Sequence, residues 1–197
     1  MENHILQAFK SAQSGLNALI DNPKTIRSIS EAAEVLIHTL NHGGKLYSCG
    51  NGGSMCDAMH FAEEFTGRFR KNRKSIGAVA ISDPSFLSCA ANDFGYDQVF
   101  SRFIEGVGIK GDVLFAISTS GNSPNIINAV AKSKELGLKS IVLTGKKDCN
   151  LGKMADIHIP TPVDTPYSDR VQELHIKCIH ILVELCERSL FPHLYGS

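Results

Sequence analysis

The sequence predicts an α/β protein in which helices cover both faces of a parallel β-sheet, a three-layer α-β-α arrangement. Short apolar stretches alternate with helical patterns along most of the 197-residue chain. The stretch 113–117 is apolar at every position, and strands without alternation are typical of a parallel sheet that is buried on both faces. The length suits one domain, so we expect a single domain over residues 1–197.

Two helices are expected before the first strand. Apolar residues recur at helical spacing over residues 4–20 and again over residues 24–41. The segment Asp21–Pro23 interrupts the pattern, and Gly43-Gly44 ends the second helix, because glycine favours the positions just beyond a helix C-terminus. We expect residues 1–42 to form an N-terminal helical hairpin that is an integral part of the domain.

Strands and helices alternate in the rest of the chain. Five strands are expected, at residues 45–49, 77–81, 112–117, 139–144 and 156–160. Helices are expected between them, at residues 55–65, 85–91, 98–105 and 124–136. A long C-terminal helix from about residue 168 to residue 189 closes the chain. Two segments have the composition of linkers, the basic 70–74 and the proline-rich 161–167.

The charge balance and the cysteine pattern narrow the possible partners. Lys and Arg together number 20, as do Asp and Glu, so the formal net charge is zero and a general nucleic-acid binder is not expected. No apolar stretch reaches the ~18 residues of a membrane span. The 6 cysteines are scattered without a CxxC pair, which favours free thiols in a reducing compartment. We therefore expect a cytoplasmic protein without a nucleic-acid or membrane partner.

A polar loop, Ser118–Ser123, follows the third predicted strand, and Pro124 then marks the start of a helix. Ligands of such sheets bind beyond the carboxyl ends of the strands, and a helix N-terminus offers free N–H groups that can bind a phosphate without Lys or Arg. A capping loop is the alternative, but one cap needs one polar residue, and here five of six positions are polar. The loop matches neither a Walker A nor a GxGxxG motif, which disfavours nucleoside triphosphates and NAD.

A second loop, Gly50–Ser54, follows the first predicted strand and contains Asn51 between glycines. Glycine lets a backbone approach a ligand closely. A tight turn alone would also explain the glycines, but the position at a carboxyl end of the sheet favours a surface that faces a ligand.

The predicted helix after this second loop carries His60 and Glu64, four residues apart and thus on one face. An imidazole and a carboxylate can share a metal ion or transfer a proton. An ordinary hydrogen-bonded surface pair is the alternative, and the spacing alone does not exclude it. Glu63 is rotated by ~100° about the helix axis from Glu64, so we expect it to point elsewhere.

The C-terminal helix carries Gln172 and His180, eight residues apart, which corresponds to roughly 12 Å of helix rise. They cannot touch directly, but each could reach toward a ligand or metal ion that lies between them. Glu173 and His175 on the same helix are as compatible with solvent exposure as with a function, and they are assigned no role. Helical geometry alone does not choose among these residues.

Five motifs, taken in order, resemble those of the sedoheptulose 7-phosphate isomerases, also called phosphoheptose isomerases, of the SIS sugar-isomerase superfamily. They are Ser48–Ser54, Asp57–Glu64, Asn92–Gly95, Ile117–Ser123 and Gln172–Lys177. The Ser-Thr-Ser-Gly loop alone would indicate only the superfamily, whereas the ordered set covers nearly the whole chain. The resemblance implies a SIS fold and an aldose–ketose isomerase that converts sedoheptulose 7-phosphate to D-glycero-D-manno-heptose 7-phosphate through an enediol. In Gram-negative bacteria this reaction is the first step toward the ADP-heptose of lipopolysaccharide core.

The resemblance also implies roles for individual residues. Phosphate binding is implied for Ser118, Thr119, Ser120 and Ser123. Contacts with the rest of the substrate are implied for Asn51, Gly52, Gly53, Glu64, Asn92, Asp93 and Gln172. Proton transfer is implied for Glu64 and His180, and binding of one Zn²⁺ per subunit for His60, Glu64, Gln172 and His180. A homotetramer with active sites at the subunit interfaces is also implied.

Two alternatives come from the same superfamily. One is an isomerase of another sugar phosphate, which a substrate panel would distinguish. The other is a non-enzymatic regulator that binds the replication initiator DnaA, but such regulators lack the acidic catalytic residue. The presence of Glu64, Gln172 and His180 in this sequence favours the enzyme.

Overall fold

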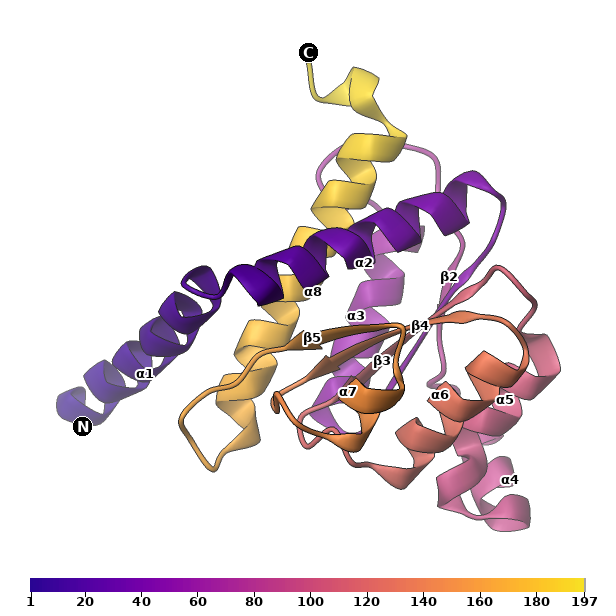
Figure 1. The fold of residues 1–197 in the computed structure, drawn as a ribbon, viewed down its shortest axis with the longest axis horizontal. Helices are drawn as coiled ribbons and strands as arrows, with labels where there is room; N and C mark the ends of the chain where they lie inside the picture. Colours follow the sequence, from indigo (N-terminus) through magenta and orange to yellow (C-terminus); the bar gives the residue numbers. More distant parts are fainter. Residues whose placement is uncertain (197) are drawn as a thin grey trace.

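The computed structural model describes residues 1–196 and confirms the predicted α/β architecture. Its sheet contains β1 (Leu46–Gly50), β2 (Ala78–Ala80), β3 (Val113–Ser118), β4 (Lys139–Thr144) and β5 (Ile157–Pro160). The strands lie in the order β2-β1-β3-β4-β5, and every neighbouring pair is parallel. The carboxyl ends of the strands therefore share one edge of the sheet (Figure 1).

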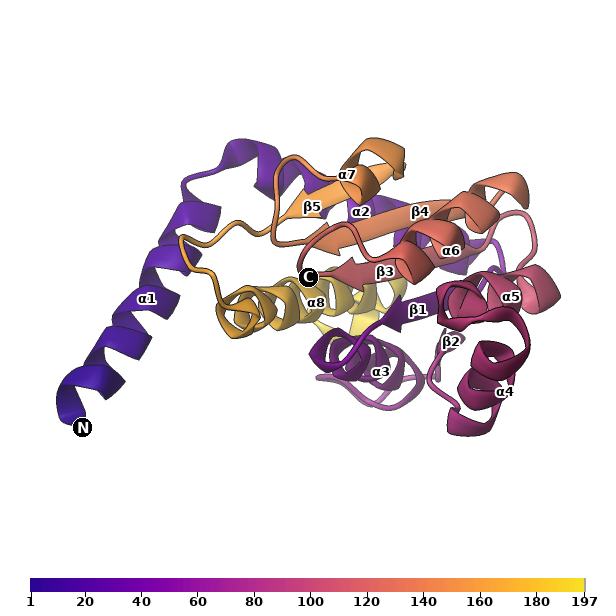
Figure 2. The same cartoon turned by 90° about the horizontal axis from the view of Figure 1, so that it is seen from below.

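Helices cover both faces of the sheet, as the uniformly apolar strands predicted (Figure 2). One face is packed by α2 (Pro23–Asn41), α3 (Gly53–Thr66) and α8 (Ser168–Leu190). The other is packed by α4 (Pro84–Phe94), α5 (Val99–Val107), α6 (Pro124–Glu135) and the short α7 (Asn150–Met154). Successive residues of β3 point to opposite faces of the sheet. Phe115 packs in the core under α2, α3 and α8, and Leu114 packs in the core under α4 to α7. Both faces of β3 are thus buried, which explains why it has no polar position before Ser118.

The two N-terminal helices form close to the predicted ranges, but they do not lie antiparallel as expected of a hairpin. Helix α1 (Glu2–Ile20) extends away from the rest of the molecule, and α2 continues from its end across the sheet (Figures 1 and 2). Asn22 caps α2 immediately, because its side chain accepts hydrogen bonds from two N–H groups of the first turn at 3.2 and 3.3 Å. The two helices instead both pack against α8, where Gly15 of α1 lies beside Leu174.

Three short helices were not predicted: α7, η1 (Tyr96–Gln98) and η2 (Pro192–Leu194). Each has too few residues to show a helical period in the sequence. Cys149 caps the start of helix α7, because its Sγ accepts a hydrogen bond from the Gly152 N–H at 3.4 Å. Within the described chain, no helix has both the length and the apolar character of a membrane span.

His175 of α8 is fully buried, which contradicts the expectation that it could be solvated. Among residues 1–196, neither of its ring nitrogens has a hydrogen-bond partner. Burial therefore disfavours the charged imidazolium and lowers the pKa of His175 from 6.5 to about 4. The imidazole is neutral at pH 7 and behaves as part of the core.

Replacement of His175 is expected to make the protein less sensitive to mild acid. Below pH 6.5 the unfolded chain binds a proton at His175 that the folded protein does not bind until about pH 4. Stability is therefore lost as the pH falls through this window, by a total of about 3 kcal/mol. His175→Leu should show a shallower fall in unfolding free energy between pH 6.5 and 5 in urea titrations. An unchanged slope would mean that His175 is not buried in its neutral form.

Candidate active site

Most of the predicted site residues gather at the carboxyl edge of the sheet and where α3 meets α8. The loop after β1 leads into α3, and the loop after β3 leads into α6. Strands β1 and β3 are direct neighbours in the sheet, so the two loops lie side by side. The arrangement follows from the parallel topology, which places both loops at one edge.

The loop Ser118–Ser123 is folded by its own hydroxyl groups. The Oγ of Ser118 lies 3.0 Å from that of Ser123 and 3.4 Å from that of Ser120, and it accepts a hydrogen bond from the Gly121 N–H at 3.2 Å. Ser118 is buried and supports the loop, whereas Ser120 is exposed and accessible to a ligand. The Ser123 side chain makes no capping bond to α6. Pro124 has no N–H, and the N–H groups of Ile126 and Ile127 donate to the Ser123 carbonyl at 3.1 and 3.0 Å. The Asn125 N–H is thus the group of this turn that can serve an anion.

Two backbone hydrogen bonds hold this loop against the segment after β4. The carbonyl of Thr119 accepts a hydrogen bond from the Gly145 N–H at 3.0 Å, and that of Gly121 accepts one from Leu151 at 3.1 Å. Gly121 has a φ of +68°, and a Cβ at this position would lie 2.4 Å from the Sγ of Cys149. Only glycine fits both the backbone conformation and the available space.

The amide of Asn51 connects the glycine-rich loop to the phosphate loop. Asn51 and Asn125, in the first turn of α6, each donate from Nδ2 to the other's Oδ1 at 2.9 Å. The hydroxyl of Tyr96 also donates to the Oδ1 of Asn51, at 3.0 Å. The sequence-based reasoning missed Asn125 and Tyr96, because nothing in the linear pattern places them beside Asn51. The three side chains join the two loops into one surface.

Gln172 of α8 lies against the start of α3. A Cβ on Gly53 would lie 2.5 Å from the Nε2 of Gln172, so the amide packs directly on the Gly53 backbone. Gly52, which precedes it, has a φ of +54° and open space around its Cα. Helix α8 therefore brings Gln172 to the glycine-rich loop, as its predicted role in substrate binding requires.

His60, Glu64 and His180 converge where α3 meets α8. The two histidine Nε2 atoms are 2.9 Å apart, and the Nε2 of His60 lies 3.2 Å from Oε1 of Glu64. The three side chains offer ligand atoms that all lie within 4.8 Å of one another. The spacing of His60 and Glu64 in the sequence left an ordinary surface pair open, and the arrival of His180 from another helix now favours a functional cluster.

The environment shifts the pKa values of Glu64 and His180 toward each other. Burial, followed by the charge of Glu63, raises the pKa of Glu64, and the nearby His60 and Arg73 oppose this. Burial, followed by the positive charge of His60, lowers the pKa of His180. The carboxyl group therefore gives up its proton less readily and the imidazole gains one less readily. A carboxyl group and an imidazole held this close can each donate a proton to a substrate or accept one from it.

Two further carboxylates lie beside His60. The expectation that Glu63 points elsewhere is wrong, since its Oε2 lies 3.3 Å from the Nδ1 of His60. Asp57, one turn earlier on α3, has a buried Oδ2 without a hydrogen-bond partner in the described part of the chain. Burial raises the pKa of Asp57 to about 6, against the opposing charge of His60. The sequence-based reasoning did not single out Asp57, because its burial depends on the tertiary packing.

The cluster of two imidazoles and one carboxylate matches the donor types of a zinc site. In a tetrahedral site with ~2.1 Å bonds, neighbouring ligand atoms are on the order of 3.4 Å apart, close to the separations of His60 from Glu64 and His180. Gln172 lies instead at Gly53, seven residues or about 10 Å of helix rise from His60 along α3. The structure therefore places three of the four predicted ligands together and leaves Gln172 nearer the glycine-rich loop.

Asn92 and Asp93 lie at the exposed end of α4. The Nδ2 of Asn92 donates to Oδ1 of Asp93 at 2.8 Å, and the Sγ of Cys89 lies 3.6 Å from Oδ2 of Asp93. Tyr96, three residues further along the chain, reaches Asn51. This segment is thus joined to the glycine-rich loop through Tyr96, whereas Asn92 and Asp93 bond to their own helix.

Comparison with known proteins gives a consistent family. Residues 9–145 match the SIS domain family. The chain is 53% identical over 186 residues to the phosphoheptose isomerase of Glaesserella parasuis, which covers 94% of this chain and 96% of that protein. It is 54% identical over 186 residues to the phosphoheptose isomerase of Pectobacterium atrosepticum, again with 94% and 96% coverage.

Solved structures agree with these sequence matches. The phosphoheptose isomerase GmhA from Neisseria gonorrhoeae is similar with a TM-score of 0.81 at 36% identity, over 94% of this chain and 96% of that chain. A phosphoheptose isomerase from Francisella tularensis gives a TM-score of 0.88 at 30% identity, over 94% and 97%. The fold, the near-complete coverage and the convergent polar site lead to one conclusion: the chain belongs to the phosphoheptose isomerase family of SIS-domain proteins.

Proposed function

We propose that the protein isomerises sedoheptulose 7-phosphate to D-glycero-D-manno-heptose 7-phosphate through an enediol, as an intramolecular oxidoreductase. The observation that carries this proposal is the convergence of His60, Glu64 and His180 from α3 and α8, where α3 begins at the glycine-rich loop beside the phosphate loop. The product would enter the route to ADP-heptose and lipopolysaccharide core in the cytoplasm. Its relatives are named phosphoheptose isomerases, which supports a heptose phosphate as the substrate.

In this proposal the substrate phosphate sits at the N-terminus of α6. The Asn125 N–H and the side chains of Thr119, Ser120 and Ser123 would bind it, and the buried Ser118 would hold the loop in shape. The sugar would extend over the glycine-rich loop. There the polar groups of Asn51, Gly52, Gly53, Asn92, Asp93 and Gln172 would contact its hydroxyls.

The reaction requires removal of a proton from C1 of the ketose and delivery of a proton to C2, together with proton transfer at the two oxygens. We assign these transfers to Glu64 and His180. A raised pKa makes the carboxylate a stronger base than a free one, and the carboxyl and imidazole groups can each hold or release a proton. Gln172, which packs on Gly53, would orient the C1–C2 end of the substrate toward Glu64 and His180.

We also propose that His60, Glu64 and His180 hold one Zn²⁺ per subunit, with Gln172 as the further ligand that the family resemblance implies. A bound zinc ion would polarise the carbonyl oxygen and stabilise negative charge on the enediolate. We expect a chelator to remove activity and added Zn²⁺ to restore it, measured as turnover together with metal content. Full activity at a metal content near zero would contradict the zinc assignment.

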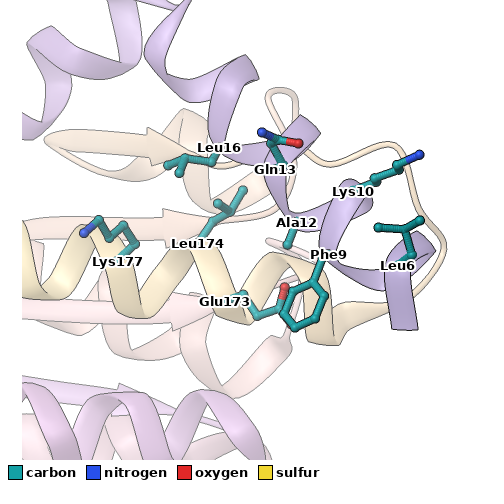
Figure 3. Close-up of a pocket in the computed structure, with 9 residues that line it drawn as sticks. All are labelled: Leu6, Phe9, Lys10, Ala12, Gln13, Leu16, Glu173, Leu174 and Lys177. Carbon is teal, nitrogen blue, oxygen red and sulfur yellow. The ribbon is translucent and has the colours of Figure 1, made fainter. Parts of the chain in front are cut away.

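The exposed face of α1 supports the proposal of a homotetramer. Leu6 and Phe9 are 53% and 71% exposed, and they line an apolar groove between α1 and α8 together with Leu16 and Leu174 (Figure 3). Apolar surface of this kind commonly marks a protein–protein contact. We further infer that the N-terminal helices belong to one SIS domain with the sheet, because α2 and α8 share its core.

A substrate panel tests the proposed function. Purified protein would be supplied with sedoheptulose 7-phosphate, a hexulose 6-phosphate and a pentulose 5-phosphate, and aldose formation would be followed. We expect the highest kcat/KM for the heptulose. A higher value for a shorter sugar would favour another SIS isomerase, and absence of turnover on all three, with intact folding, would favour the regulatory alternative.

A further inference from the structure

A buried ion pair joins the ends of α3 and α8, the two helices that carry His60, Glu64 and His180 (the catalytic cluster). The side chains of Arg73 and Glu187 are 0% and 1% exposed, and the Nε of Arg73 lies 3.0 Å from Oε1 of Glu187. Arg73 belongs to the connection between α3 and β2, and Glu187 lies in the last turn of α8. The pair therefore links three segments of the chain at one point.

Arg73 also binds the C-terminal end of α3. Its guanidinium donates from Nη2 to the Glu64 carbonyl at 2.7 Å, and from Nη1 to the carbonyls of Phe65 at 2.8 Å and Gly67 at 3.1 Å. Carbonyl groups in the last turn of a helix lack intrahelical partners, and a positive charge there is favourable. Arg73 thus caps α3, and one of its bonds is made to the main chain of Glu64 itself.

Glu187 is satisfied on both oxygens by the same region. Its carboxylate accepts hydrogen bonds from the N–H groups of Arg70 at 3.3 Å and Lys71 at 3.5 Å. It also accepts a hydrogen bond from the Tyr195 hydroxyl, which comes from the C-terminal segment beyond α8. The carboxylate thereby fixes the connection after α3 against the end of α8.

The Arg73–Glu187 pair lies on the same α3–α8 contact, here called the seam, as the catalytic cluster. His180 and Glu187 are seven residues apart, about two turns, and therefore project from one face of α8. Glu64 lies in the last turn of α3 and contacts His60 at 3.2 Å, and His60 in turn lies 2.9 Å from His180. Any change in the separation or rotation of the two helices at Arg73–Glu187 changes these distances directly.

A solely stabilising role is the simpler explanation, but the chemistry argues against it. A buried ion pair contributes little net stability compared with apolar residues of similar size, because both charges lose their hydration. A planar guanidinium with five donors instead fixes geometry, since it holds several acceptors at set directions. Arg73 uses this property on the main chain of a helix that carries two of the site residues.

We propose that Arg73 and Glu187 are positioning residues that set the spacing of α3 and α8, so that Glu64 meets His180 at a working distance. The inference rests on the proposed function, since it assigns these helices to proton transfer and zinc binding. Neither residue touches the substrate in this account. They act through the backbone of Glu64 and through the helix that carries His180.

The test compares three variants of the full chain. Arg73→Lys keeps the charge but loses the carbonyl contacts, Glu187→Gln keeps the size but loses the charge, and Asp156→Asn is the matched control. Asp156 is a partly buried carboxylate that accepts from the Ser140 N–H at 2.9 Å at the start of β4, far from the α3–α8 seam. The measurements are kcat, KM for sedoheptulose 7-phosphate, zinc affinity by calorimetry, and the unfolding temperature.

For both seam variants we expect kcat to fall about tenfold or more and zinc affinity to fall about 10- to 100-fold. KM should stay within about threefold, because the phosphate loop lies on other elements. Asp156→Asn should lower the unfolding temperature while kcat and zinc affinity stay at the wild-type values. The inference is overturned if either seam variant, folded at the assay temperature, keeps wild-type kcat and zinc affinity. If the wild type itself does not isomerise the substrate, the proposed function fails, and the difference in zinc affinity still decides the role of the pair.

Should Arg73→Lys fail to fold, Glu187→Gln decides the inference, because it leaves the contacts of Arg73 with the carbonyls of Glu64, Phe65 and Gly67 in place. A seam variant that lowers the unfolding temperature as much as Asp156→Asn does, without any loss of zinc affinity, would show a solely structural pair.

Discussion

Glu64→Gln is expected to reduce kcat by about 10²–10⁴-fold, the usual contribution of one acid–base group. The amide keeps the shape of the side chain but can neither accept nor release a proton near neutral pH. KM should change by only a few fold, because the phosphate loop lies on β3 and α6 rather than on α3. Steady-state kinetics with sedoheptulose 7-phosphate would measure both constants, and full turnover in this variant would remove Glu64 from the reaction.

Glu63→Gln is the matched control for this experiment. Glu63 is the neighbouring carboxylate, it lies 3.3 Å from His60, and its side chain is 63% exposed. An exposed ion pair of this kind contributes about 0–1 kcal/mol, so kcat should stay within about fivefold of the wild type. Equal losses in the two variants would indicate a general electrostatic effect instead of proton transfer at Glu64.

Gly121→Ala is expected to damage substrate binding and stability together. The new Cβ would lie 2.4 Å from the Sγ of Cys149, at a φ of +68°. Left-handed strain of about 1–2 kcal/mol and overpacking of about 1–3 kcal/mol together lower the unfolding free energy by about 2–5 kcal/mol. Displacement of the loop removes hydrogen bonds to the charged phosphate, so KM should rise about tenfold or more. Urea unfolding and steady-state kinetics measure the two effects.

Gly43→Ala separates backbone strain from the steric clash. Gly43 has a φ of +79°, no atom of residues 1–196 lies within 4 Å of the position that a Cβ would take, and the residue follows α2, away from the phosphate loop. This variant should lose only about 1–2 kcal/mol and keep the wild-type KM. If Gly121→Ala behaved in the same way, the close contact with Cys149 would have no bearing on substrate binding.

The fold was largely predictable from the sequence because its strongest signals are local. The continuous apolar run of β3 predicted a sheet covered on both faces, and Pro124 marked the first residue of α6. The relation of α1 to α2 was not predictable, because the break at Asn22 ends one helix and starts the next without defining the angle between them. The burial of His175 was also not predictable, since an imidazole on a helix gives no local sign of the face it occupies.

The site was predictable in its parts but not in its assembly. Each of the loops and the His60–Glu64 spacing could be recognised in one stretch of sequence. The contact of Gln172 with Gly53 joins residues 119 positions apart, and periodicity carries no information about such pairs. The segment 70–74 has the composition of a linker, yet Arg73 within it is fully buried by tertiary contacts. A basic residue in a polar stretch gives no indication that its partner lies on another helix.

The central claim is that the protein transfers protons through an enediol at the cluster of His60, Glu64 and His180. Turnover of sedoheptulose 7-phosphate in D₂O, followed by NMR of the product, tests it most directly. Proton transfer by side chains that exchange with solvent should place deuterium at C2 of the heptose 7-phosphate, in the wild type and not in Glu64→Gln. A product that forms at full rate with no solvent deuterium at C2 would contradict the account, because the hydrogen at C2 would then come from C1 of the substrate and not from a side chain that exchanges with solvent.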